Sequence, residues 1–570
     1  MNLDFDTCYR AVSSRDQRFD GYFFTAVRTT GIYCRPSCPA TTPQSANVEF
    51  HPSAAAAQRA GFRACKRCRP DATPGSPEWN SRNDVVGRAM RLIIDGYVDR
   101  HGVSGLAQAL SYSERQLNRV LLAELGAGPL SIARARRAQT ARILIETTDL
   151  AQSAVAFAAG FSSIRQFNDT VGAVFATTPT QLRAAARGRK GAIRRDQSLL
   201  GPDLGHAGAK AEPGATAPPG GTIRVRLAYR RPCDLGSSLA FLSERAVPGL
   251  EWGDGKRFMR SLSLSHGWAI MAVGVDGASG DSATGTAGEI TPGGANAGRY
   301  VDASFQLQDF RDLTEAVQAA RRMLDLDADP MTVSEQLGAD PVIGALVQAH
   351  PGRRVPGHPD GAELAIRAIL GQQVSVAGAR RLAARLIEEY GTPLPDGSRA
   401  GPGVDPDGSR AEGPRASLPR RLSYSFPPMD KLAGLDPTLL PLTRSRAACL
   451  VALAGALASG KIDLGPGADR DEATYRLEEL AGIGPWTSAY ICMRALGDPD
   501  SFLPSDLGVR KALEGMGLDA TPASATALAQ SWRPWRSYAL VHLWARPPAP
   551  ARLLAATRRT AATRSTATKG

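Results

Sequence analysis

The chain has 570 residues, with 68 Lys and Arg against 55 Asp and Glu and a formal net charge of +13. That length excludes a single hydrophobic core, and the lack of any run of ~18 apolar residues excludes a membrane-spanning helix. Eight cysteines in 570 residues exclude a disulfide framework, and the basic surplus favours a polyanionic partner such as nucleic acid.

Two close pairs of cysteines lie near the N-terminus, in "TTGIYCRPSC" and "ACKRC". Their spacing, Cys34-x3-Cys38 and Cys65-x2-Cys68 with 26 residues between the pairs, is typical of a tetrahedral zinc site with four thiolate ligands. A purely structural zinc is one interpretation. The other is a reactive thiolate, because zinc keeps each sulfur deprotonated and nearby basic residues would draw in a phosphate backbone. Those residues are Arg35, Arg63, Lys66, Arg67 and Arg69.

An internal repeat follows, in which "LAQALSYSERQLN" (106–118) aligns without a gap on "AFAAGFSSIRQFN" (156–168). In each copy a helix of small residues leads through a turn into Ser-x-x-Gln, the pattern that caps a new helix. The repeat predicts two helix-turn-helix units, joined by a long helix over 128–149 that opens at Pro129. The polar face of each second helix carries side chains suited to base edges in a major groove. These are Arg115, Gln116, Asn118 and Arg119, then Arg165, Gln166 and Asn168. A solvated helix face is the alternative, against which the duplication argues.

Breaks in composition divide the chain into segments. Gly, Pro and Ala replace apolar periodicity over 187–221, which predicts a flexible linker, and "DGSRA" occurs twice in 391–420, which predicts a disordered insertion. The basic tail 546–570 predicts disorder. The four remaining segments are 1–78 with the cysteines, 80–186 with the repeat, 222–345 opening on a strand in "TIRVRLAY", and the mostly helical 346–545.

The segment "LEELAGIGPWTSAY", residues 477–490, predicts two helices joined by a Gly-Ile-Gly turn. Gly482 and Gly484 would let backbone amides approach a phosphate at a helix N-terminus, where the helix dipole favours anions. Asp506 follows in "FLPSDLGVRKAL". A capping or surface carboxylate is the alternative interpretation of this aspartate.

The first two segments resemble known DNA-binding families. Residues 1–78, through "FFTAVRTTGIYCRPSC" and "GFRACKRCRPD", resemble the N-terminal domain of the Ada regulator of the response to DNA alkylation. That resemblance implies one Zn²⁺ held by four cysteines and irreversible transfer of a methyl group from a DNA phosphotriester to Cys34. Methylation would remove a negative charge and raise the affinity for DNA. Residues 80–186 resemble the AraC-type DNA-binding domain, which implies promoter DNA and RNA polymerase as partners.

Residues 222–545 resemble the AlkA-type 3-methyladenine glycosylases of the helix-hairpin-helix class, through "RAILGQQVSVAGAR", "GIGPWTSAY" and "WRPWRSYALVHLWA". The resemblance implies that Asp506 is the catalytic carboxylate, which either stabilises an oxocarbenium-like sugar or activates water. It places Trp486, Tyr490 and Trp544 in the base pocket, where stacking holds a flipped base. It also implies that Gln372 and Gln373 contact DNA, although the family inserts a leucine into the duplex at the position that Gln373 occupies here. Trp486 stands where related lyases have a Schiff-base lysine, so no lyase step is expected.

The predicted fold is multidomain and mainly α with α+β parts: a small four-cysteine zinc domain, an AraC-type double helix-turn-helix, an AlkA-type N-terminal α+β domain, and a helix-hairpin-helix glycosylase domain. The expected function combines stoichiometric methyl transfer, methylation-switched transcriptional regulation and monofunctional excision of alkylated bases from double-stranded DNA. The alternative is a regulator with a structural zinc and an inactive glycosylase-like region. We expect no organic cofactor, no membrane partner and a cytoplasmic, nucleoid-associated location. The chain lacks Pro-Cys-His-Arg, so no repair of O6-alkylguanine is expected.

Overall fold

The computed structural model describes residues 4–70, 82–190, 222–274, 300–395 and 422–545. The predicted tail, and most of the predicted linker and insertion, lie outside these residues. Two predicted boundaries move. Helix α10 (Pro179–Lys190) makes residues 187–190 helical instead of linker. Strand β10 (Thr392–Pro393) pairs with β11 (Tyr424–Ser425), so the start of the predicted insertion belongs to a small sheet.

The N-terminal unit is a four-stranded sheet in the order β3-β1-β2-β4, flanked by short helices. Strands β2 and β4 run parallel, whereas β1 pairs antiparallel with β2 and β3. Because β2 ends at Cys34 and β4 ends one residue before Cys65, the two cysteine pairs follow neighbouring strands at the same edge of the sheet. The elements are α1 (Phe5–Ser13), η1 (Gln17–Phe19), β1 (Phe24–Val27), β2 (Ile32–Cys34), η2 (Ser45–Asn47), β3 (Val48–His51), α2 (Ala54–Arg59) and β4 (Arg63–Ala64).

Two helix-turn-helix units follow, and the repeat is longer than the sequence predicted. Ser113 and Ser163 cap α6 and α9 through their side chains, as expected. Both helices then end on a left-handed residue, Gly126 (φ 65°) and Ala176 (φ 49°), and each next helix opens on a proline. The helices are α4 (Val85–Ile94), α5 (Tyr97–Ala109), α6 (Glu114–Leu125), α7 (Pro129–Thr147), α8 (Gln152–Ala158), α9 (Ile164–Phe175) and α10.

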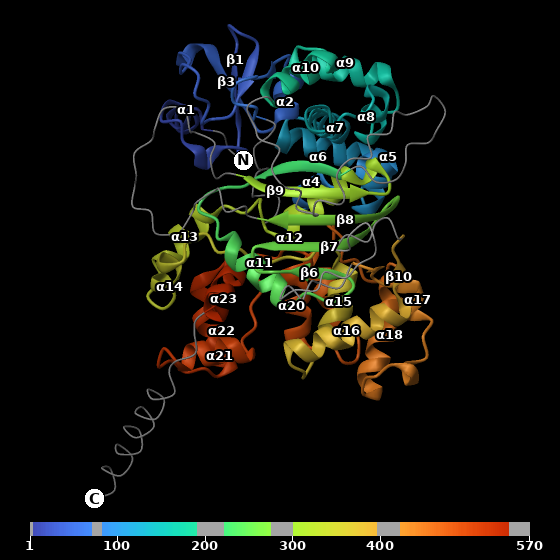
Figure 1. The fold of residues 1–570 in the computed structure, drawn as a ribbon. Helices are drawn as coiled ribbons and strands as arrows, with labels where there is room; N and C mark the ends of the chain where they lie inside the picture. Colours follow the sequence, from blue (N-terminus) through green and yellow to red (C-terminus); the bar gives the residue numbers. More distant parts are fainter. Residues whose placement is uncertain (1–3, 71–81, 191–221, 275–299, 396–421, 546–570) are drawn as a thin grey trace, which may run out of the picture.

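A five-stranded antiparallel sheet in the order β5-β9-β8-β7-β6 forms the middle of the molecule (Figure 1). The predicted first strand is present, and its apolar residues Ile223, Val225 and Leu227 are buried. Helices α11 (Leu235–Glu244) and α12 (Leu313–Met323) contact the sheet. The strands are β5 (Thr222–Ala228), β6 (Glu251–Gly253), β7 (Arg257–Leu264), β8 (Gly267–Gly274) and β9 (Tyr300–Leu307), and η5 (Phe310–Asp312) precedes α12.

Most of the remaining helices lie below this sheet in Figure 1, with α13 at its left, and they pack into two apolar clusters. Val333 of α13 and Val347 of α14 pack with Leu513 and Leu543 near the C-terminal end. The predicted boundary between 345 and 346 therefore falls inside a packed unit that begins near 328. The helices are α13 (Pro330–Gly338), α14 (Gly344–Ala349), α15 (Gly361–Leu370), α16 (Val376–Tyr390), α17 (Met429–Ala433), η7 (Pro437–Leu439), α18 (Arg444–Ala458), α19 (Arg470–Glu478), α20 (Pro485–Ala495), α21 (Leu507–Glu514), α22 (Pro522–Leu528), η8 (Ala529–Trp532) and α23 (Arg536–Trp544).

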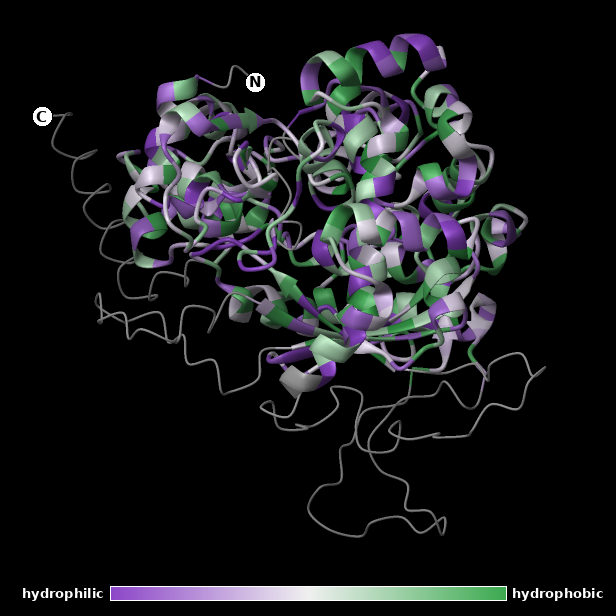
Figure 2. Ribbon diagram, turned by 90° about the horizontal axis from the view of Figure 1, so that it is seen from above, coloured by the Kyte–Doolittle hydropathy of each residue, from purple (hydrophilic) through white to green (hydrophobic). Residues whose placement is uncertain are grey.

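The units share a core. One apolar cluster runs from Tyr33 in the N-terminal unit through Phe167 in α9 to Phe305 in the middle sheet. Viewed from above, hydrophilic and hydrophobic residues alternate along the helices, as amphipathic packing requires (Figure 2). Buried polar contacts cross the same interface, because Arg230 Nη2 donates to the Asp20 carbonyl at 2.7 Å. The sequence predicted separate segments and gave no sign of this shared core.

No helix in the described part of the chain is both long and apolar enough to span a bilayer.

Candidate functional sites

The four clustered cysteines come together as predicted, and their sulfur atoms all lie within 4.8 Å of one another. Tetrahedral zinc with Zn–S bonds of ~2.3 Å separates its sulfurs by ~3.8 Å, so the cluster fits this ion. Cys65 and Cys68 are buried, whereas Cys34 and Cys38 are partly exposed. Hydrogen bonds with Cys38 and the other two thiols raise the pKa of Cys34, while hydrogen bonds with Cys34 and its neighbours lower that of Cys65. Four thiols this close therefore share protons unless a cation holds them all as thiolates.

A buried carboxylate organises the loop between Cys34 and Cys38. Asp20 accepts hydrogen bonds from the Ser37 amide at 3.0 Å and the Ser37 hydroxyl at 2.6 Å, and it pairs with Arg35 at 3.2 Å. Burial raises the pKa of Asp20, and the Arg35 guanidinium opposes that effect. The Asp20 carbonyl also receives the hydrogen bond from Arg230. One residue thus connects the cysteine loop to the middle sheet, a contact that no sequence motif indicated.

Three of the basic residues expected to draw in phosphate make contacts inside the protein. Arg35 pairs with Asp20, Arg69 pairs with Glu146 of α7 at 2.5 Å, and Lys66 Nζ donates to the Ala176 carbonyl at 3.3 Å. The last two contacts hold the cysteine unit against α7 and the end of α9. Arg67 remains exposed.

The polar faces of α6 and α9 are open to solvent. The side chain of Arg165 is 93% exposed and lies 3.9 Å from Asp169. The two glutamines have a second role, because the Gln116 and Gln166 side-chain oxygens accept hydrogen bonds from Ser113 and Ser162 at the helix starts. Their amide nitrogens are the groups left to contact a base. The other predicted residues on these faces are exposed: Arg115, Asn118, Arg119 and Asn168.

Asp506 caps α21 and also lies among aromatic side chains, so its capping role does not exclude the catalytic role that the resemblance implies. Its Oδ1 accepts hydrogen bonds from the amides of Gly508 (2.8 Å) and Val509 (3.1 Å) and from Trp544 Nε1 (2.9 Å). Its Oδ2 accepts one, from Trp486 Nε1 at 3.3 Å. Because Oδ1 is bound by three donors, Oδ2 is the oxygen with lone pairs to spare.

Two stacked aromatic pairs surround this carboxylate. Trp486 and Tyr490 stack with ring centroids 5.3 Å apart, and Trp544 stacks on Phe241 at 6.3 Å. Phe241 lies on α11, far from the hairpin in sequence, and no motif identified it. A positive charge lies beside one of these pairs, because the Arg245 guanidinium is 3.8 Å from the centroid of the Phe241 ring.

The Gly-Ile-Gly turn lies between α19 and α20. Gly482 has φ 99°, a backbone conformation that favours glycine, and a Cβ added there would make a tight contact with Cys449 at 3.1 Å. Gln372 Nε2 donates to the Gly482 carbonyl at 2.9 Å and to Thr487 Oγ1 at 3.3 Å. Gln372 therefore ties the end of α15 to the turn. Gln373 is exposed with a left-handed φ of 56°.

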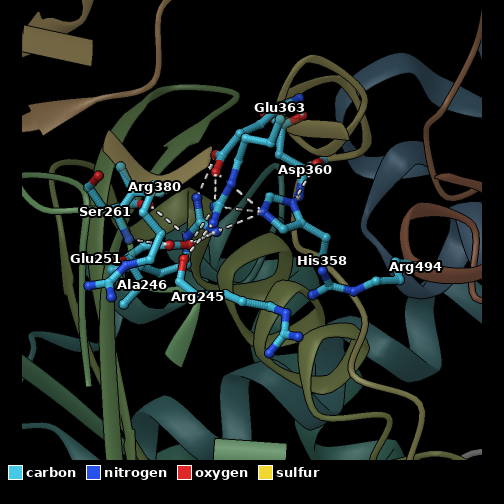
Figure 3. Close-up of polar contacts among 12 residues, drawn as sticks. Arg245, Ala246, Glu251, Ser261, His358, Asp360, Glu363, Arg380 and Arg494 are labelled. Carbon is cyan, nitrogen blue, oxygen red and sulfur yellow. Dashed lines mark hydrogen bonds and ion pairs between the residues drawn. The ribbon is translucent and has the colours of Figure 1, made fainter. Parts of the chain in front are cut away.

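A second group of possible metal ligands lies at the junction of the middle sheet and α15 (Figure 3). Glu251, His358 and Glu363 are buried together there, but Arg260 Nη1 donates to Glu251 at 2.9 Å and Arg260 Nη2 donates to Glu363 at 2.6 Å. Arg367 bonds to both carboxylates. Despite burial, Arg260 and its neighbours hold the pKa of Glu363 well below its usual range. Two guanidiniums balance two carboxylates, so this is an ion network that joins two units.

Comparisons with known domains agree with the three resemblances predicted from sequence. The metal-binding domain of Ada matches residues 7–71, a helix-turn-helix domain matches 106–185, and the AlkA N-terminal domain matches 224–360. The last match extends past the predicted boundary at 345.

Similar proteins cover nearly the whole chain. The Mycobacterium tuberculosis protein described as a probable bifunctional transcriptional activator/DNA repair enzyme AlkA is 47% identical over 544 residues, 95% of this chain and 97% of that protein. DNA-3-methyladenine glycosylase 2 of Escherichia coli is 31% identical over 56% of this chain and 95% of its own length. The bifunctional transcriptional activator/DNA repair enzyme Ada of Escherichia coli is 37% identical over 24% of this chain and 37% of its own length. The chain belongs to the family of bifunctional transcriptional activator/DNA repair enzymes AlkA, in which an Ada-type zinc-binding domain and a helix-turn-helix domain precede an AlkA-type glycosylase region.

Proposed function

We propose that this protein repairs alkylated DNA at two centres and regulates transcription in response. Cys34 takes a methyl group from a DNA methylphosphotriester, and Asp506 serves the excision of alkylated bases of the 3-methyladenine type. The observation that carries the proposal is the Asp506 carboxylate, held against the indoles of Trp486 and Trp544 beside the glycine turn. A regulator with an inactive C-terminal region would have no need of this arrangement.

For the first centre we propose that Cys34, Cys38, Cys65 and Cys68 hold one Zn²⁺. When bound, the ion supplies the charge that keeps all four sulfurs anionic. Cys34 Sγ attacks the methyl carbon, the carbon–oxygen bond breaks, and its electron pair stays on the phosphate as a diester anion. Partial exposure of Cys34 supports its access to DNA, but Cys38 is partly exposed too. The choice of Cys34 rests on its match to the Ada motif.

For the second centre we propose hydrolysis without strand cleavage. Asp506 Oδ2 either stabilises positive charge on the sugar or activates the attacking water. By the resemblance, Trp486 stands where related lyases have a Schiff-base lysine, and its indole donates to Asp506. This supports excision without a lyase step. The aromatic residues Trp486, Tyr490 and Trp544 would hold the flipped base by stacking. Gly482 and Gly484 would bind the backbone phosphate, and Gln373 would enter the duplex beside it.

For regulation we propose that α6 and α9 read promoter DNA through Arg115, Arg165 and their neighbours, and that methylation strengthens this binding. Activation implies contact with RNA polymerase and a location at the nucleoid. We further propose that residues 1–78 and 80–186 act together as the DNA-responsive half, while residues from 222 to 545 act as the glycosylase half.

Two assays on the full chain test the proposal. Incubation with alkylated duplex DNA should release free 3-methyladenine over many turnovers, and no release would reject the glycosylase function. Mass spectrometry after exposure to methylphosphotriester DNA should find one added methyl group on the peptide that carries Cys34. An unmodified peptide would leave the zinc with a structural role alone.

A further inference from the structure

A buried arginine lies behind the aromatic site. Arg494 of α20 is 6% exposed, and its side-chain nitrogens donate three hydrogen bonds. Nε donates to the Pro356 carbonyl at 2.8 Å, Nη2 to the Gly357 carbonyl at 3.2 Å, and Nη1 to the Tyr490 hydroxyl at 2.7 Å. The Arg494 carbonyl accepts from the His358 amide at 2.8 Å. Figure 3 shows Arg494 beside His358, a member of the buried ion network, and the backbone bond between the two residues joins α20 to that network.

The hydrogen bond from Arg494 determines whether the Tyr490 hydroxyl can donate or accept a further hydrogen bond. A guanidinium only donates, so the hydroxyl oxygen must accept the bond from Arg494 with a lone pair. Its own hydrogen then has no acceptor within hydrogen-bonding distance among the residues that the structure describes. Burial by itself would raise the pKa of Tyr490, but the charge and hydrogen bond of Arg494 outweigh it and lower that pKa. A more acidic hydroxyl is a stronger hydrogen-bond donor.

We propose that Arg494 is a positioning residue that turns the Tyr490 hydroxyl into a hydrogen-bond donor to the departing base. The inference rests on the proposed glycosylase function and deepens it. As the glycosidic bond breaks, its electron pair moves onto the base nitrogen. Water oxygen takes the place of that nitrogen on the sugar, and the released water proton goes to a base that leaves with negative charge, or to solvent when the base leaves neutral. Tyr490 keeps its proton throughout and stabilises the developing charge through a hydrogen bond.

The benefit of such a donor depends on the charge of the base. An alkylated purine that carries a positive charge leaves as a neutral molecule and needs little stabilisation. A neutral damaged base leaves with negative charge, so it needs a donor far more. The positive charge of Arg494, 5.0 Å from the Phe241 ring and 5.6 Å from the Tyr490 ring, also favours the neutral base. The Arg494–Tyr490 pair should therefore extend the enzyme to neutral lesions.

Single-turnover excision by the full chain tests this inference, with duplexes that carry either 7-methylguanine as the cationic base or hypoxanthine as the neutral one. Tyr490→Phe removes only the hydroxyl and keeps the ring. It should slow hypoxanthine release about tenfold and 7-methylguanine release by less than about threefold. Arg494→Met should show the same preference, and the double variant should be no slower than the slower single variant, because Arg494 acts through Tyr490.

Each outcome decides between the alternatives. Equal losses on both bases, or unchanged rates for Tyr490→Phe, would overturn the inference and leave Arg494 with a structural role. Failure of the wild type to release hypoxanthine would overturn it too, while release of 7-methylguanine would still uphold the proposed function. Failure on both bases would reject the glycosylase function itself. Thermal unfolding identifies an Arg494→Met variant that does not fold, and Tyr490→Phe then decides alone.

Discussion

The two reactive centres are built in opposite ways. The four thiols come from two short loops that follow neighbouring strands, so spacing in the sequence is enough to bring them together. The Asp506 site gathers side chains from α11, α20, α21 and α23, which lie far apart along the chain. Residue spacing alone indicates the local centre, whereas the members of the dispersed centre were expected only through resemblance, and Phe241 was identified only in the folded structure.

The centres also differ in what the reaction leaves behind. In the proposed transfer, the Cys34 thiolate becomes a stable thioether, so that centre is expected to act once. In the proposed hydrolysis, the Asp506 carboxylate is left unchanged and can act again. Substitutions at the two centres should therefore distinguish a centre that is consumed from one that turns over.

The largest effect is expected at the acceptor. Cys34→Ser should abolish methyl uptake from methylphosphotriester DNA, because an alcohol is a far weaker nucleophile than a zinc-bound thiolate. Cys38→Ser, at the other partly exposed ligand, should still place a methyl group on Cys34, although more slowly. Peptide mass spectrometry measures both. Base excision by Cys34→Ser should remain, and its loss would show that the two centres are not independent.

The next effect concerns the carboxylate. Asp506→Asn should slow base excision on the order of 10²–10³-fold, because a neutral amide cannot stabilise a developing cation. Asparagine still caps helices, so α21 and the melting temperature should be preserved. Asp519→Asn is the matched control, since Asp519 is an exposed aspartate that accepts the Thr521 amide bond outside the site. A similar loss in both variants would exclude a specific role for Asp506.

A smaller effect is expected on promoter binding. Arg165→Ala should weaken binding to the operator by about 1–3 kcal/mol, the usual value of a good arginine–base contact. Arg226→Ala is the control: it removes an exposed arginine on β5, outside the helix-turn-helix units, and should leave the affinity for the operator unchanged. Fluorescence anisotropy at fixed salt gives both affinities. If the Arg165 variant bound random DNA and operator with the same proportional loss, the residue would contact only phosphate.

The smallest effect tests whether the two halves are physically joined. The Tyr22 hydroxyl donates to Asp329 across the interface at 2.8 Å, so Tyr22→Phe should lower the free energy of unfolding by about 1 kcal/mol. Hydrogen exchange near the start of α13 should become faster. Tyr9→Phe is the control, because Tyr9 makes a similar bond to Pro43 inside the N-terminal unit. Equal acceleration near α13 in both variants would argue against the interface.

Much of the local structure was predictable from the sequence. The alternation in "TIRVRLAY" predicted β5, and the Ser-x-x-Gln pattern predicted where α6 and α9 begin. The cysteine spacing predicted the thiol cluster. All of these signals act over a few residues, where backbone geometry links pattern to conformation. The hairpin and Asp506 were predicted through resemblance, and the structure brings them to the aromatic residues expected around them.

The remaining features depend on contacts between distant segments. Apolar periodicity shows that a residue is buried but does not say against which unit, so the shared core and the membership of α13 and α14 were missed. Arginines usually lie at the surface, and nothing in the sequence distinguished Arg230 or Arg494 from their solvated neighbours. Phe241 was missed because its stacking partner, Trp544, lies at the other end of the glycosylase half, and the sequence does not show that the two rings meet.

Simultaneous measurement of both reactions shows whether a consumed centre and a catalytic centre occupy the same chain. Protein is mixed with a large excess of duplex DNA that carries both methylphosphotriesters and 3-methyladenine, and protein mass and free base are followed together. We predict that each chain gains one methyl group, on Cys34, and then stops, while free base continues to accumulate far beyond one molecule per chain. Base release that ends at one equivalent would exclude a catalytic glycosylase centre, and protein that gains no methyl group would exclude the methyl acceptor.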